Sequence, residues 1–134
     1  MSATMIVGKI LFAAPNVTKN IEVGRMRQPM QAPFIVLYHT YESQDYFLPS
    51  AVEHYETRVS VEIVTDDAIQ CDQQAEAVKA CLSYVAHREV SNGSNPGWED
   101  VCCFKAGGDQ YDYDDERTVY RRVIDYRVRW KPAL

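Results

Sequence analysis

The sequence predicts an α+β fold, an α/β sandwich in which one main helix packs on a mostly four-stranded antiparallel sheet. Apolar and polar residues alternate along 57–64 and again along 118–130, which is the period of a half-buried strand. Between these segments, the apolar residues of 67–86 recur in steps of three and four, as in an amphipathic helix. The connections are of hairpin length, so we expect antiparallel neighbours with the helix on one face of the sheet.

Composition limits the class of protein. The chain has 134 residues, of which 46% are hydrophobic and 25% charged, and this fits a single soluble globular domain over 1–134. Its net charge of −5 argues against nucleic-acid binding over the whole surface. The apolar run 5–14 is too short to span a bilayer, so no membrane association is expected. The four cysteines and three histidines show neither a disulfide framework nor metal-ligand spacing, which predicts reduced thiols, no metal and no cofactor.

The first third of the chain predicts one apolar element and an arm. Residues 1–14 are predicted to form one element that ends at Pro15. Their apolar positions suit the period of either structure, so this element is a short N-terminal helix or a strand. Residues 15–33 carry scattered glycine and proline and predict an extended arm or loop, with Arg25 and Arg27 exposed.

Two strands are predicted next. Residues 34–41 are rich in branched and aromatic side chains, 43–45 are predicted as a turn, and 46–57 as an insertion with room for a short hairpin. Strand 57–64 places its apolar residues on one side: Val59, Val61 and Ile63.

The helix of about 67–86 begins at an N-cap signal, Thr65-Asp66-Asp67. We expect its apolar stripe to lie on the apolar face of strand 57–64. The stripe consists of Cys71, Ala75, Val78, Leu82 and Val85.

The last third predicts two further strands. Residues 91–97 are loop-like in composition, 98–105 form a strand, and 106–108 turn into an acidic loop. The closing strand 118–130 has two distinct faces. One carries Tyr120, Arg122, Ile124, Tyr126, Val128 and Trp130; the other carries Arg121, Val123, Asp125, Arg127 and Arg129.

Charge separates sharply in this region. Residues 109–116 hold five acids and no base, whereas 117–131 hold six bases and one acid. A monomer does not need this separation to fold, whereas complementary patches set the register between copies of a chain. The predicted subunit or partner interface comprises Arg25, Arg27, Tyr111, Asp112, Tyr113, Asp114, Asp115, Arg121, Arg127 and Arg129.

Other interpretations of these charges stay open. The acidic segment could be a solvated hairpin tip, or could hold Ca²⁺ or Mg²⁺, although it lacks the glycine and terminal glutamate of the twelve-residue calcium loop. The arginines could pair with Asp125 and Glu62 within one sheet, or face DNA in a ring lumen with weak, sequence-independent contacts. No nucleophile elbow or glycine-rich phosphate loop is present, so no enzyme activity is expected.

The order of elements from 24 to 38, through 55–63, to the closing strand 118–130 resembles the tail terminator, or tail completion, proteins of long-tailed bacteriophages. The resemblance covers residues 20–131 and implies an α/β fold with an antiparallel sheet. It also implies a hexameric ring that caps the tail tube, stops its polymerisation and presents the surface for head attachment. The implied partners are other copies of the chain, the tail-tube protein and the head-completion protein, at the head-proximal end of a virion tail assembled in the bacterial cytoplasm.

Two alternative functions are a head-tail connector of the same assembly and a small module that binds a ligand or peptide. The second would use the sheet aromatics as a platform: Tyr38, Tyr41, Tyr126 and Trp130.

Overall fold

The computed structural model describes residues 2–24, 32–47, 52–116 and 118–132. Two helices and six strands follow one another along the chain: α1 (Ser2–Ala13), β1 (Ile21–Val23), β2 (Phe34–Phe47), β3 (Val52–Thr65), α2 (Ala68–Leu82), β4 (Val85–Asn92), β5 (Asn95–Asp114) and β6 (Val119–Pro132). The strands form a single sheet in the order β1-β2-β3-β6-β5-β4. Only β1 and β2 pair in parallel, and the other neighbours are antiparallel.

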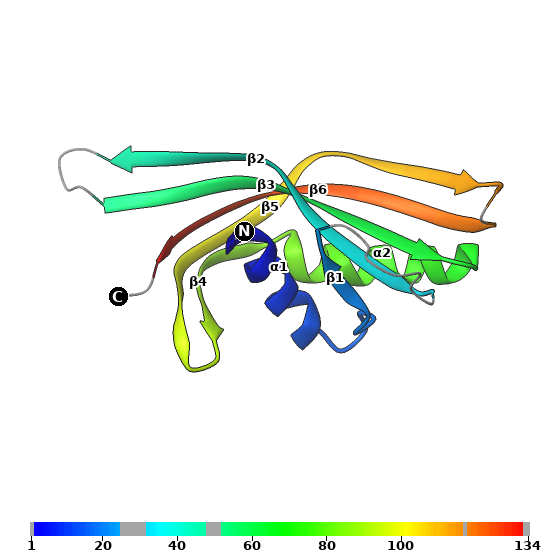
Figure 1. Cartoon of the computed structure of the whole chain (residues 1–134), viewed down its shortest axis with the longest axis horizontal. Helices are drawn as coiled ribbons and strands as arrows, with labels where there is room; N and C mark the ends of the chain where they lie inside the picture. Colours follow the sequence, from blue (N-terminus) through cyan, green and yellow to red (C-terminus); the bar gives the residue numbers. More distant parts are fainter. Residues whose placement is uncertain (1, 25–31, 48–51, 117, 133–134) are drawn as a thin grey trace.

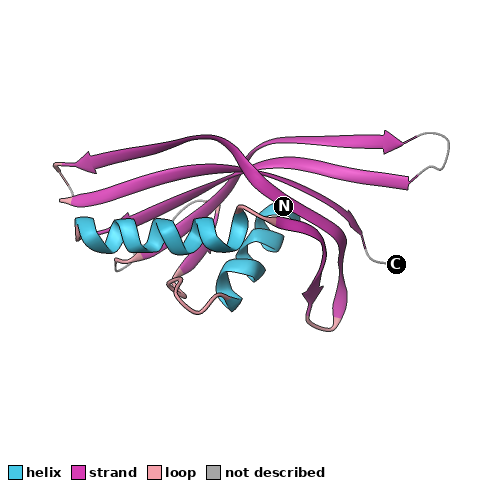
Figure 2. Ribbon diagram, turned by 180° about the vertical axis from the view of Figure 1, so that it is seen from behind, coloured by secondary structure: helices cyan, strands magenta, loops and turns pink. Residues whose placement is uncertain are grey.

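Both helices cover the same face of the sheet (Figures 1 and 2). The α+β class is therefore confirmed, but the sheet has six strands and not the four that were predicted. The two additional strands are β1, which lies in the predicted arm, and β4, which follows α2 directly.

The core lies between the helices and the sheet. The predicted stripe of α2 is buried at Cys71, Ala75, Val78 and Leu82. The last three of these share one core with the apolar side of β3, as expected. The predicted alternation of β6 is confirmed by the buried side chains of Ile124, Tyr126, Val128 and Trp130.

The segment 1–14 is a helix, and not a strand. Its buried residues Ala3, Ile6, Val7, Ile10 and Leu11 recur in steps of one, three and four. Gly8 of α1 faces Leu37 of β2, because a Cβ added at this glycine would lie in ordinary van der Waals contact, 3.5 Å from the Leu37 side chain. The apolar residues of this segment therefore face the sheet along one side of a helix.

Helix α2 begins and ends at identifiable residues. The Asp67 carboxylate accepts a hydrogen bond from the Gln70 amide at 3.3 Å, which confirms the predicted N-cap. The helix ends at Leu82, four residues before its predicted end, with Ser83 as C-cap. Val85 is buried, but it belongs to β4 and pairs with Cys103 of β5.

Strand pairing extends into three segments that were predicted as turns or loops, so two of these predictions are wrong and the 91–97 loop is shorter than predicted. Residues 43–45 and most of 46–57 are two arms of the β2–β3 hairpin, in which Ser43 pairs with Glu56. Residues 91–97 form the ends of β4 and β5 around a turn at Gly93, whose φ is 64°. Residues 106–108 are a register irregularity within β5, not a turn.

Two long hairpins point to opposite ends of the sheet, β2–β3 to one end and β5–β6 to the other (Figure 1). Because the outer strands are short, part of each hairpin has no outer neighbour within the described ranges. Strand β1 pairs only with Ile35–Leu37, and the pairing of β4 with β5 reaches no further along β5 than Cys103. Among the described residues, the outer backbone edges of β2 from 38 to 47 and of β5 from 104 to 114 have no neighbouring strand.

Candidate functional site

The predicted interface residues lie mainly on the β5–β6 hairpin. The acidic segment 109–116 was expected as a loop, but 109–114 is the end of β5, paired with the start of β6. The described residues of the turn are 115, 116 and 118. Strand alternation consequently divides the predicted cluster between the two faces of the sheet.

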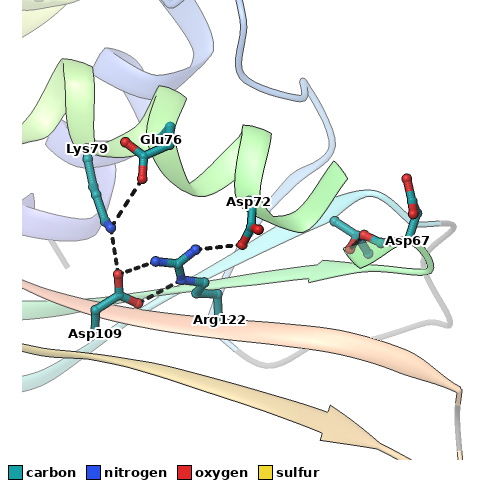
Figure 3. A network of polar contacts seen from close by, with 7 residues as sticks. Asp67, Asp72, Glu76, Lys79, Asp109 and Arg122 are labelled. Atoms are coloured by element: carbon teal, nitrogen blue, oxygen red, sulfur yellow. Dashed lines mark hydrogen bonds and ion pairs between the residues drawn. The ribbon is translucent and has the colours of Figure 1, made fainter. Parts of the chain in front are cut away.

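Asp109 lies on the helix face at the centre of a polar network (Figure 3). Arg122 of β6 donates from Nε to Asp109 Oδ1 at 2.9 Å and from Nη2 to Oδ2 at 2.6 Å. Its Nη1 reaches Asp72 of α2 at 2.9 Å, and Lys79 of α2 lies 2.7 Å from Asp109. These four residues, here called the Asp109 network, tie α2 to the β5–β6 hairpin.

The network is strongly electrostatic. The side chains of Asp109 and Arg122 are 15% and 16% exposed. The hydrogen bonds from Arg122, followed by that from Lys79, lower the pKa of Asp109 to about 2 against the opposing effect of burial. This carboxylate is therefore already satisfied within the subunit, so it contributes to the fold.

Tyr111 and Tyr113 lie on the same face as the Asp109 network, opposite Arg122 and Tyr120 in register. They are 54% and 42% exposed. The Tyr113 and Tyr120 rings pack with centroids 4.7 Å apart, and those of Tyr111 and Tyr120 are 6.3 Å apart. An exposed group of aromatic rings on a projecting hairpin is a feature of protein interfaces.

The remaining predicted acids lie elsewhere on the hairpin. Asp112 is exposed and pairs in register with Arg121, on the face opposite the helices, here called the helix-free face. Asp114 accepts a hydrogen bond from the Glu116 amide at 3.1 Å, which shapes the turn, and Asp115 is exposed beside it. Thus the acids at the tip are solvent-accessible, unlike Asp109.

The predicted arginines of β6 share the helix-free face. Arg121 lies 2.7 Å from Glu62 of β3, as the cross-strand alternative proposed. Arg127 lies 3.1 Å from Glu56, with its guanidinium 5.9 Å from the centre of the Phe104 ring. Arg129 is the register partner of Glu56 on the same face. In the single subunit, acids of β3 already accompany these bases.

On this face Asp125 contacts Ser60, whose hydroxyl donates to its carboxylate at 2.6 Å. Phe34, Val36 and Val64 form a small buried apolar cluster on the same face, against which Tyr38 and Val119 pack. On the helix-free face, most of the charged side chains lie outside this cluster, and acids alternate with bases along the sheet.

The predicted interface residues Arg25 and Arg27 lie outside the described residues. The aromatic platform for a ligand is wrong, because Tyr126 and Trp130 are buried in the core and Tyr38 lies on the opposite face. The side chain of Tyr41 is also outside the described part of the chain.

One group of polar residues was missed by the sequence interpretation. His54, His87, Asp100 and Cys102 come together from β3, β4 and β5. His54 and Asp100 are 46 residues apart, and only the pairing of the strands brings them within reach. Spacing along the chain therefore contains no signal for this group.

No protein-family model matches this chain, and no curated protein matches it. A chain in a solved structure entitled "Virion of native gene transfer agent (GTA) particle" has the same fold, with a TM-score of 0.64. The two are 13% identical, and the match covers 97% of this chain and 95% of that chain. The likeness is one of fold, and it extends over nearly the full length of both.

Neither helix in the described part of the chain has the length and apolar character needed to cross a membrane.

Proposed function

We propose that this protein is a virion structural protein, a tail terminator that forms a ring, in six copies, on the end of the tail tube. The observation that carries the proposal is the full-length likeness of fold to a chain from a gene transfer agent virion. The position proposed within the particle rests on the resemblance of the sequence to tail terminators. In this role the ring stops tube polymerisation and offers its other side to the head-completion protein.

The edges of the sheet support a ring. An unpaired strand edge is a template for another chain, and β2 and β5 each present one. The two edges differ in sequence and lie on opposite sides of the sheet, so a contact from one to the other is head-to-tail. A head-to-tail contact gives a closed ring when the rotation between neighbouring subunits divides a full turn evenly, and we propose that it does so here.

The two edges of the sheet have complementary outlines, because each has an additional outer strand at one end only. At one end of the sheet β4 is outermost beside β5, while β2 has no outer neighbour there among the described residues. At the other end β1 is outermost beside β2, and no strand that the structure describes lies on the outer side of β5. A protruding strand of one subunit therefore has a recess of matching position on the next.

The exposed tyrosines and acids of the β5–β6 hairpin form a surface that could bind a partner protein at one end of the sheet. Tyr111 and Tyr113 offer apolar area, while Asp112 and Asp115 offer charge for register. We assign the tail-tube and head-completion proteins to the two ends of the sheet, since the two hairpins point in opposite directions (Figure 1).

The test is to polymerise tail-tube subunits with and without this protein and to examine the products by negative-stain electron microscopy. We expect tubes that stop growing and carry additional density at one end. Tubes of unlimited length without that density would refute the terminator role. Binding to portal rings instead of tubes would identify the chain as a head-tail connector.

A further inference from the structure

A polar cluster on the helix-free face has the donors of a transition-metal site. His87 of β4 and Asp100 and Cys102 of β5 place one ligand atom each within 4.8 Å of one another. His87 Nδ1 is 3.9 Å from Cys102 Sγ and hydrogen-bonded to Asp100 Oδ1. The other carboxylate oxygen of Asp100 lies 2.9 Å from His54 Nε2.

The backbone is specially shaped at this cluster. His87 and Asp100 have φ of 50° and 51°, in the left-handed region that residues other than glycine seldom adopt. Both occur at register irregularities, one in β4 between Val85 and Arg88 and one in β5 between Glu99 and Cys102. Bulges and such φ values are concentrated at functional sites, where they redirect a side chain. Here two bulges on adjacent strands turn two donors toward each other.

The adjacent cysteines have opposite environments. Cys103 is buried in the core, and burial raises its pKa to about 12. Cys102 instead lies on the helix-free face beside His87. The thiol that can reach a metal is therefore the one outside the core.

We infer that His87 Nδ1, Asp100 Oδ1 and Cys102 Sγ bind a Zn²⁺ ion, with His54 holding Asp100 in place through its second oxygen. Zinc takes nitrogen, sulfur and carboxylate ligands at about 2.0–2.3 Å, so neighbouring ligand atoms lie roughly 3.5 Å apart. The cluster needs only small side-chain movements to reach that spacing. Calcium and magnesium prefer oxygen ligands alone and fit this set poorly.

His54 has a distinct part in this site. A partner that hydrogen-bonds a ligating carboxylate fixes its orientation, and loss of such a partner costs about 10- to 100-fold in metal affinity. His87 has a side chain that is 76% exposed, so water can take the fourth position of the ion.

Bound zinc would join β4 to β5 at the two bulges, where the ladder between them is interrupted. This is independent of ring formation, since all four side chains belong to one subunit. The simplest competing interpretation is a histidine–aspartate ion-pair cluster that binds no metal.

The test uses the full chain after treatment with a chelator. Co²⁺ is titrated first, because a cobalt–thiolate bond produces a charge-transfer band in the near ultraviolet, and Zn²⁺ binding is then measured by calorimetry. We expect one ion per chain and a thiolate band. Cys102→Ser should abolish the band and reduce Zn²⁺ affinity at least about tenfold, and His54→Ala should reduce affinity by about 10- to 100-fold.

The chain offers matched controls. Cys81 is partly buried in α2, where its thiol donates to the Ala77 carbonyl at 3.0 Å, and His39 is exposed on β2. Cys81→Ser and His39→Ala should bind both ions as the natural chain does. The inference is overturned if the natural chain shows no band and no heat of binding, or if Cys102→Ser retains both. Circular dichroism of each variant separates loss of ligand from loss of fold.

Discussion

Arg122 is a charged residue on the apolar face of a strand, and its partners explain why it is tolerated there. The sequence predicts its face correctly from the alternation of β6. Its partners, however, are 13 and 50 residues away, on β5 and α2. The position of Asp109 on this same face depends on the register irregularity between Lys105 and Asp109, which no local pattern indicates. Thus the direction of a side chain was predictable, but its ion pair was not.

Asp109 should make stability depend on pH in the acid range. Its pKa is about 2 in the folded chain and 3.8 in an unfolded one, so the unfolded chain binds a proton first as pH falls. Its contribution, on the order of 2 kcal/mol, is complete above about pH 4 and is lost as pH falls toward 2. We expect Asp109→Asn to lower the free energy of unfolding at pH 6 and to remove this part of the pH dependence.

The measurement is urea denaturation of both chains between pH 6 and pH 2. Asp112→Asn is the matched control, because Asp112 is exposed on the same strand and should change the profile little. A constant difference between the natural chain and Asp109→Asn over this pH range would contradict the prediction.

At the scale of elements, the sequence predicts best where one period persists. Strands β3 and β6 and helix α2 keep a regular apolar pattern, and their faces are as expected. Strand β4 was missed because four exposed residues separate its buried Val85 and Val90, so alternation is interrupted by its bulges. The end of β5 was missed because acidic residues disfavour strands, whereas pairing with β6 overrides that preference.

The N-cap of α2 is an element-scale contact that can be removed alone. Asp67→Ala deletes the carboxylate that accepts the Gln70 amide. We expect the free energy of unfolding to fall by about 1 kcal/mol. In urea denaturation, Asp66→Ala at the exposed neighbouring position should have almost no effect, and equal losses in the two variants would show that Asp67 does not act as a cap.

The acidic tip of the β5–β6 hairpin is the other element open to test. Reversing Asp114 and Asp115 to lysine should weaken ring formation, most strongly at low salt, if the tip sets the register between subunits. Light scattering and electron microscopy of assembled rings measure this effect. The matched control is Asp66→Lys with Glu76→Lys, which changes net charge equally on exposed positions of the α2 region. Unchanged assembly of the tip variant would exclude a subunit contact there.

At the scale of the whole molecule, the outer edges of β2 and β5, which have no neighbouring strand in the described part of the chain, were beyond prediction from the sequence. They exist because β1 and β4 are short, and both short strands lay in segments that lack a strand pattern. The class of the fold was accessible from periodicity alone, but the number of strands and the exposed edges depend on long-range pairing.

These edges predict where assembly protects the backbone. In the free chain, amide hydrogens along the outer sides of 38–47 and 104–114 should exchange rapidly, and in rings or capped tubes they should slow. Hydrogen exchange with mass spectrometry compares the two states. The core strand β3 is the internal control, since it has neighbours on both sides. Equal exchange of the edges in both states would rule out sheet-edge contacts between subunits.

The helix-free face pairs its bases with acids of the next strand, as Arg121 does with Glu62 and Arg127 with Glu56. If this face lines the channel of a ring, DNA leaving the head meets a wall whose net electrostatic field is weak, because its charges are paired. A phosphate would have to separate an existing ion pair before it could bind an arginine, and it would release few counterions in doing so. Such a wall would neither attract nor repel the DNA phosphates strongly, so DNA could move along it in either direction.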